Sequence, residues 1–152
     1  MTYKSNQQLL QGAVKTGLIN AVINAGIQYF LLKDKAPIAI SVDSITNHED
    51  TVLGAAVMLA VSLAMILTAI AYVMVKKPRP AFFPYGFWLV LKHGFFTFGV
   101  VTALAVMWQR LFGSIDVSLG VALVMIGVIA GLVAGAVEYL TIHACQERSQ
   151  KA

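Results

Sequence analysis

Four apolar stretches, at about residues 12–32, 51–75, 86–108 and 117–142, alternate with short polar segments along the chain. Each stretch has the roughly 20 predominantly apolar residues that a helix needs to cross the hydrocarbon core of a bilayer. The four prolines and most of the charged residues lie outside the stretches. The pattern predicts an all-α fold, an integral membrane four-helix bundle that forms a single transmembrane domain over residues 1–152.

The composition supports a membrane protein. The chain is 59% hydrophobic and only 12% charged, with a mean hydropathy of +0.78, whereas soluble domains carry about 25% charged residues. The net charge of +4 comes from basic residues that flank the apolar stretches, without the clustered arginines and aromatic side chains of a nucleic-acid-binding surface. We expect the lipid bilayer to surround the chain, and no nucleic acid among its partners.

Lysine and arginine are distributed unequally between the two sides of the predicted bundle. Short basic loops stay in the cytoplasm, and with four spans both termini share one side with the loop at residues 76–80. That side holds eight basic residues and the opposite side holds three. The distribution predicts a multi-pass protein of the inner (plasma) membrane with both termini cytoplasmic.

The two halves of the chain resemble each other. Residues 15–17 match residues 92–94, and residues 69–72 match residues 136–139, each pair in equivalent spans. The matches favour two tandem helical hairpins in a parallel repeat, an organisation known among transporters. The sequence Lys-Lys-Pro-Arg-Pro at residues 76–80 joins the halves, because proline does not continue a helix.

The longest loop is predicted at residues 33–50. Its apolar part, residues 38–42, either lies on the membrane surface or packs over the first hairpin. Thr46 and Glu49 have the spacing of a capping box at a helix start. A metal or proton site built from His48, Glu49, Asp50 and Asp43 is the alternative. The spacing is not that of a zinc site, and we expect no bound metal.

Glycines recur on one face of the last apolar stretch. At about 100° per residue, Gly120, Gly131 and Gly135 lie within about 80° of Gly127, and Glu138 lies at about 20°. Small residues let helices approach closely in a membrane, and an ionisable side chain avoids lipid. This glycine zipper predicts a helix-packing face, within the bundle or between copies, and places Glu138 in the interior.

Three amides share one face of the first stretch. Asn20, Asn24 and Gln28 follow at spacings of four and span about 80°. They either hydrogen-bond between helices, as polar residues in membranes do, or line a hydrated path. Counted from the cytoplasmic ends, Asn20 and Glu138 differ in depth by about one helical turn, so we expect them to meet or to share a water molecule.

Glu138 shares its depth with Lys15, Lys92 and His93. Because an unpaired carboxylate is costly in apolar surroundings, three states are open. Glu138 forms an ion pair with Lys92 or Lys15 that locks the bundle, takes up a proton or cation, or stays at the interface. Lys92 and His93 either snorkel from a shallow position or face inward.

Enzymatic chemistry has little support in the sequence. His93 and His143 raise the alternative of a b-type haem, but His143 lies near a helix exit and the chain has no second pair of histidines. Combinations of a nucleophile with a base are absent at membrane depth. The single cysteine, Cys145, excludes an intramolecular disulfide and predicts a buried or interfacial thiol. We expect no catalysis and no cofactor.

Residues 15–30, Lys-Thr-Gly-Leu-Ile-Asn-Ala-Val-Ile-Asn-Ala-Gly-Ile-Gln-Tyr-Phe, resemble the first helix of small, uncharacterised four-span bacterial membrane proteins that are sometimes labelled permeases. The leading hypothesis is a permease-like or channel-like protein, oligomeric, in which Asn20, Asn24 and Glu138 line a polar path for a small ion or solute. The alternative is a non-catalytic accessory or structural subunit of a larger membrane complex, suggested by the glycines and the short loops.

Overall fold

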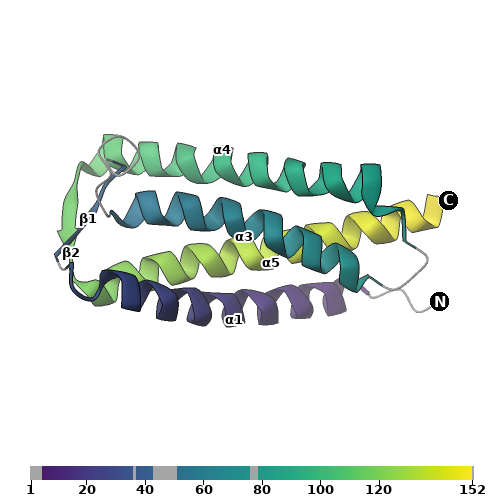
Figure 1. The fold of residues 1–152 in the computed structure, drawn as a ribbon, viewed down its shortest axis with the longest axis horizontal. Helices are drawn as coiled ribbons and strands as arrows, with labels where there is room; N and C mark the ends of the chain where they lie inside the picture. The colour runs from purple at the N-terminus through teal and green to yellow at the C-terminus, as the bar shows by residue number, and fades with distance from the viewer. Residues whose placement is uncertain (1–4, 36, 43–50, 76–78, 152) are drawn as a thin grey trace.

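The fold is an elongated helical bundle. The computed structural model describes residues 5–35, 37–42, 51–75 and 79–151. Its long helices are α1 (Asn6–Leu32), α3 (Val52–Met74), α4 (Phe87–Phe112) and α5 (Leu119–Lys151), which run along one common axis (Figure 1). The start of α1 and the end of α5 lie at one end of the bundle, here named the termini end, and two short strands lie at the other, the strand end (Figure 1). The predicted helical fold is confirmed.

Three of the helical segments are long and apolar enough to cross a membrane: Val52–Met74, Phe82–Phe112 and Leu119–Gln150. Within the described part of the chain α1 is not among them, because three amides and Lys15 interrupt its apolar sequence. The outer surface of α1 is nevertheless apolar, with Val22 and Phe30 mostly exposed. Exposed Met58, Phe95 and Leu132 continue that surface on the other helices, as expected where a bundle meets lipid.

Two helix starts are fixed by hydroxyl side chains. Ser5 accepts a hydrogen bond from the backbone of Gln8 while the Gln8 side chain accepts one from Ser5, which completes a capping box at α1. Thr51 caps α3 by accepting from the backbone of Gly54. The predicted capping residues Thr46 and Glu49, and the metal alternative around His48, lie outside the described residues.

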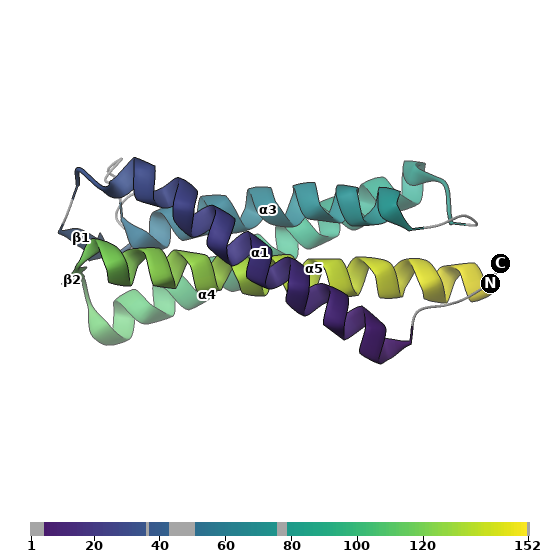
Figure 2. The ribbon, with the colours of Figure 1, turned by 90° about the horizontal axis from the view of Figure 1, so that it is seen from below.

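Helix α5 is the centre of the bundle, packed against both α1 and α3. Figure 2 shows α1 crossing α5 at an angle, with the two helices running in opposite directions. Ala56, Ala60 and Ala64 of α3 and Ala130 and Ala134 of α5 are fully buried where α3 and α5 pack. Alanine at every fourth position lets these helices approach closely.

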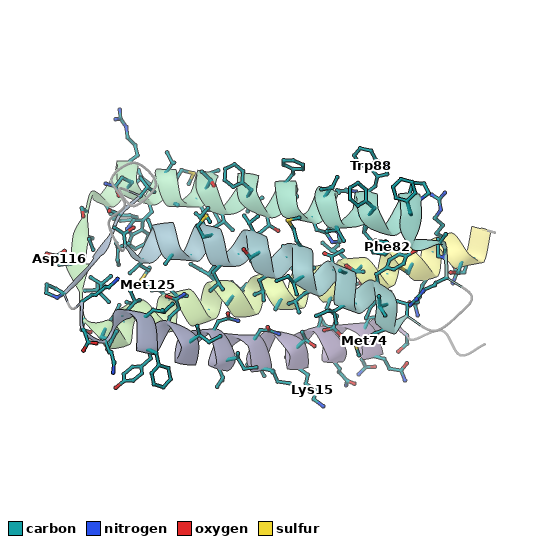
Figure 3. The ribbon with its side chains drawn as sticks, in the orientation of Figure 1. Lys15, Met74, Phe82, Trp88, Asp116 and Met125 are labelled. Atoms are coloured by element: carbon teal, nitrogen blue, oxygen red, sulfur yellow. The ribbon has the colours of Figure 1, made fainter. Side chains whose placement is uncertain are left out.

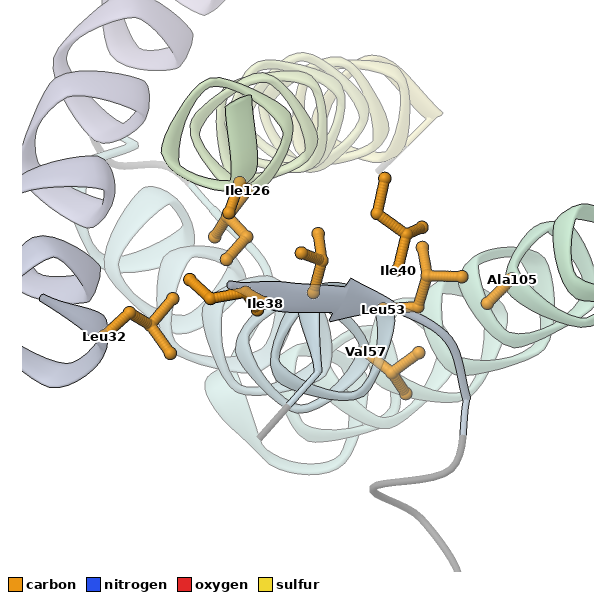
Figure 4. Packing of buried hydrophobic residues seen from close by; sticks show 9 residues of the cluster. Leu32, Ile38, Ile40, Leu53, Val57, Ala105 and Ile126 are labelled. Atoms are coloured by element: carbon orange, nitrogen blue, oxygen red, sulfur yellow. The ribbon is translucent and has the colours of Figure 1, made fainter. Parts of the chain in front are cut away.

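A two-stranded antiparallel ribbon, which the sequence pattern did not predict, closes the strand end. It pairs β1 (Ile38–Ile40) with β2 (Ile115–Val117). Ile38 and Ile40 are buried against residues from all four long helices, as Figure 4 shows for Leu32, Leu53, Val57, Ala105 and Ile126. Residues 38–40 therefore pack against the helices of the bundle.

Arg79 and Tyr72 hold the termini end of α3. The Arg79 guanidinium donates to the last carbonyls of α3, those of Tyr72 (3.0 Å), Val73 and Val75 (3.2 Å), where a cation complements the helix dipole. The Tyr72 hydroxyl lies 2.6 Å from the carbonyl oxygen of Pro80. A short turn, η1 (Phe82–Gly86), leads directly into α4.

Candidate functional site

The glycines of α5 meet the small residues of α1 at backbone contact distance. A methyl carbon placed on Gly17 would lie 2.7 Å from the carbonyl oxygen of Gly131. One placed on Gly135 would lie 2.9 Å from the carbonyl oxygen of Ala13, and one on Gly127 would lie 3.1 Å from that of Ala21. Since ordinary contacts of such a carbon begin at 3.4 Å, side chains larger than hydrogen do not fit at Gly17 and Gly135 without movement of a helix.

Gly120 lies apart from this contact. It is exposed near the start of α5, and a methyl carbon added to it would meet nothing within 4 Å. The structure therefore brings Gly127, Gly131 and Gly135 together with α1, but not Gly120.

The amides of α1 donate to their own helix. Asn20 Nδ2 lies 2.9 Å from the carbonyl oxygen of Thr16, and Asn24 Nδ2 lies 2.8 Å from that of Asn20. Asn24 is buried, whereas Asn20 and Gln28 are half-buried. In the described part of the chain, none of the three makes a hydrogen bond to another helix.

Glu138 lies beside Gly12, two helical turns from Asn20. A methyl carbon on Gly12 would be 3.5 Å from Glu138 Oε1, and eight residues of α1, roughly 12 Å, separate Gly12 from Asn20. Glu138 is half-buried, and no salt bridge joins it to any other described residue. Lys92 is exposed, and Lys15 points away from the bundle (Figure 3), so the lock between Glu138 and a lysine is not formed in this structure.

The interior polar contact between helices is centred on His93, which faces inward. Its Nδ1 lies 2.9 Å from Thr68 Oγ1 on α3 and 3.4 Å from Thr141 Oγ1 on α5. All three side chains are buried. His93 thus connects α3, α4 and α5 at one level of the bundle.

The two threonine neighbours of His93 fit different tautomers of its ring. The Thr68 hydroxyl donates its only proton to the carbonyl oxygen of Ala64, 2.6 Å away. The contact between Thr68 and His93 is therefore a hydrogen bond when Nδ1 carries hydrogen and donates to Thr68. In the other tautomer Nδ1 accepts from the Thr141 hydroxyl, 3.4 Å away, so the contacts do not select one tautomer. Among the described residues Nε2 has no hydrogen-bond partner.

Sequence reasoning named His93 but not Thr68 or Thr141. A signal existed, because Thr68 continues the four-residue spacing of Ala56, Ala60 and Ala64 on the buried side of α3. A hydroxyl on an otherwise apolar buried face is satisfied by its own helix or by a neighbour. A hydropathy average over α3 does not distinguish such a residue from its apolar neighbours.

A groove of about 430 Å³ runs between α4 and α5. His93 and Leu140 line it toward the termini end, and Trp108 and Met125 line it toward the strand end. Its walls include Phe96, Val100, Leu104 and Leu132, which are largely exposed. The groove therefore opens on the side of the bundle, and it includes neither the α1 amides nor Glu138.

Two other candidates from the sequence lie outside the groove. His143 stacks on the ring of Tyr139 and has its Nδ1 3.9 Å from Glu147 Oε1. Cys145 is fully buried against Tyr72 and Leu89. Within the described ranges, no group of three or more histidine, cysteine or acidic side chains is placed to hold a metal ion.

No family model, curated protein or solved structure matches the chain. The resemblance of residues 15–30 to small four-span proteins stays a prediction.

Proposed function

We propose that this protein is a non-catalytic accessory subunit of a larger membrane assembly. The observation that carries the proposal is the close packing of α1 on α5, where Gly17 and Gly131 meet backbone to backbone. Asn20 and Asn24, the residues expected to line a path, direct their donors to their own helix at this contact. A bundle closed in this way acts through its outer surface.

The test is the composition of the complex extracted from membranes. The protein carrying an affinity tag is isolated in a mild detergent, and the mass of the complex is measured. A larger partner at a fixed ratio is expected. A homo-oligomer with no other protein would overturn the accessory role.

A permease-like or channel-like function for a small ion or solute is the second candidate, favoured by Glu138. This carboxylate is half-buried beside Gly12, about 9 Å along α1 from the helix start, with no cation paired to it among the described residues. A carboxylate at that depth exchanges protons or cations. A homo-oligomer would supply the remaining walls of a path.

Flux measurements in proteoliposomes test this candidate. If Glu138 serves transport, Glu138→Gln abolishes flux while an exposed-site control, Glu147→Gln, retains it. Equal flux through wild type and Glu138→Gln would reject the role of Glu138.

We also propose four spans, with α1 crossing the membrane beside α5, and a duplication of the helix–strand–helix unit. Each half of the chain has a helix, a strand and a second helix, and the two strands pair with each other. The glycine zipper then serves packing within one copy.

An inner-membrane location with both termini cytoplasmic follows from the basic residues at residues 76–80 and at the ends of the chain. A Cys145→Ala background with single cysteines at exposed Asp116 or Gln150 tests it. In intact cells an impermeant thiol reagent should label position 116 and not position 150; the reverse pattern would invert the topology.

A further inference from the structure

Two neighbouring tyrosine rings at the termini end each lie beneath an arginine. The rings of Tyr72 on α3 and Tyr85 in η1 have centroids 6.3 Å apart. The Arg79 guanidinium carbon lies 5.6 Å from the centroid of the Tyr72 ring, and that of Arg148 on α5 lies 4.6 Å from the centroid of the Tyr85 ring. These four residues, named here the arginine–tyrosine cluster, bring two positive charges to one place in the fold.

Hydrogen bonds hold both rings of the arginine–tyrosine cluster. The Tyr72 hydroxyl donates to the carbonyl oxygen of Pro80. The Tyr85 hydroxyl donates to that of Ala144, 3.2 Å away, and so ties η1 to α5. An aromatic face attracts a guanidinium that lies over it. Arg148 is therefore positioned by the Tyr85 ring although it is exposed to the surroundings.

The N–H donors of Arg148 are not engaged by the protein. Within the described residues Arg148 makes no hydrogen bond and no salt bridge. The adjacent acid, Glu147, has its Oε1 3.9 Å from Nδ1 of His143. Arg79 donates to the carbonyls of α3 through Nη1. In the described part of the chain, the two arginines therefore have no acid paired with them, and Arg148 presents its planar fork of donors outward.

The fork of a guanidinium matches the paired oxygens of a phosphate, to which it donates two parallel hydrogen bonds. The surroundings of the cluster favour a phosphate that is carried by a lipid. Phe82 packs edge-on against Tyr72 with ring centroids 5.5 Å apart, and Phe83 and Trp88 are 73% and 64% exposed. Figure 3 shows Trp88 projecting outward from α4 near the termini end. Because exposed aromatic side chains concentrate at the level of the lipid head groups, we expect Arg148 to lie at that level.

We propose that Arg148 binds the phosphate of an anionic phospholipid, in the positive field of Arg79. A lipid with a net negative charge is preferred, because the ammonium group of a zwitterionic head already neutralises its own phosphate. The lipid would occupy the leaflet on the side of the termini end. Lipid binding needs only this protein, so it is independent of the accessory role and of transport.

Lipid titrations test the preference for an anionic head. The purified protein in a nonionic detergent is titrated with phosphatidylglycerol or with phosphatidylcholine of the same acyl chains, and bound lipid is counted by native mass spectrometry. The Kd for phosphatidylglycerol should be at least about fivefold lower, since one basic residue beside an anionic lipid contributes about that factor. Equal Kd values for the two lipids would overturn the proposal.

Two charge variants locate the site. Arg148→Gln should raise the Kd for phosphatidylglycerol about fivefold and leave that for phosphatidylcholine unchanged. Arg110→Gln removes the same charge from an exposed arginine in the last turn of α4, at the strand end, and should change neither Kd. Equal effects of the two variants would mean that net charge alone attracts the lipid, and would overturn the site. An unchanged Kd in Arg148→Gln would also overturn it.

Inorganic phosphate distinguishes a lipid from a free anion as the source of the phosphate group. At the same concentration as the lipid, it should neither remain bound in the mass spectrum nor displace phosphatidylglycerol from the wild type. Displacement of the lipid by an equal concentration of inorganic phosphate would overturn the assignment of a lipid as the occupant.

Discussion

Replacing Gly17 by alanine is expected to destabilise the protein, because the added methyl carbon would lie 2.7 Å from the carbonyl oxygen of Gly131. Ordinary contact begins at 3.4 Å, so α1 and α5 must separate locally by roughly 0.7 Å. A gap of that size forfeits a quarter to a half of the dispersion energy of the affected contacts. Overpacking of this kind costs about 1–3 kcal/mol.

Gly26→Ala on the same helix is the matched control. A methyl carbon at Gly26 meets nothing within 4 Å, and alanine in a helix is favoured over glycine by about 0.5–1 kcal/mol. Both replacements gain this propensity, so the two variants should differ by the overpacking cost alone, about 1–3 kcal/mol in the free energy of unfolding. Gly127→Ala, with its nearest contact at 3.1 Å, should fall between them.

The assay is reversible unfolding in mixed micelles with increasing sodium dodecyl sulfate, followed by circular dichroism. The order of stability should be Gly26→Ala above wild type, then Gly127→Ala, then Gly17→Ala. Equal stability of Gly17→Ala and Gly26→Ala would refute the backbone contact between α1 and α5.

The same unfolding assay checks three further predictions. Thr68→Val removes the hydroxyl 2.9 Å from Nδ1 of His93, leaves only that of Thr141 at 3.4 Å, and should lower the free energy of unfolding by about 1–3 kcal/mol. A change below about 0.5 kcal/mol, the lower limit of a typical hydrogen bond, would mean that the contact does not contribute. Ile40→Asp should lower the free energy of unfolding by more than about 3 kcal/mol because Ile40 is 3% exposed. Ile115, its partner in the ribbon, is 42% exposed, and Ile115→Asp should lower it far less. Similar losses in the two variants would contradict the packing of β1. Arg79→Ala removes the cation that donates to the carbonyls at the end of α3 and should lower the free energy of unfolding by about 1 kcal/mol. Arg79→Lys keeps the charge and should retain most of this stability. Full stability of Arg79→Ala would show that the cap is dispensable.

Helix boundaries were largely predictable because hydropathy and proline act locally. The predicted stretches at 51–75 and 86–108 correspond to Val52–Met74 and Phe87–Phe112. The last helix continues to Lys151, nine residues beyond the predicted end, since a helix can extend into water past its apolar segment. The ribbon was missed because three-residue strands carry no usable periodicity.

The candidate site was predictable in its residue types but not in its contacts. An amide on a membrane helix can bond to its own helix or to a neighbouring one, and these alternatives have similar energies. The backbone of Thr16 accepts in this structure. Asn20 and Glu138 lie about two turns of α1 apart, where counting from the predicted span ends gave about one, because α1 begins at Asn6 and α5 ends at Lys151, both beyond those ends.

By itself the sequence determined the helical, apolar character of the chain and the face of α5 on which Gly127, Gly131 and Gly135 lie, because both follow from composition and a period of 3.6 residues. Tertiary structure decided that this face meets α1, that His93 bonds to Thr68, and that a groove separates α4 from α5. A helical face can pack against any partner of suitable shape, so its partner depends on how all the helices fit together. A groove forms where two helices lie apart over part of their length, and no pattern within one helix records it.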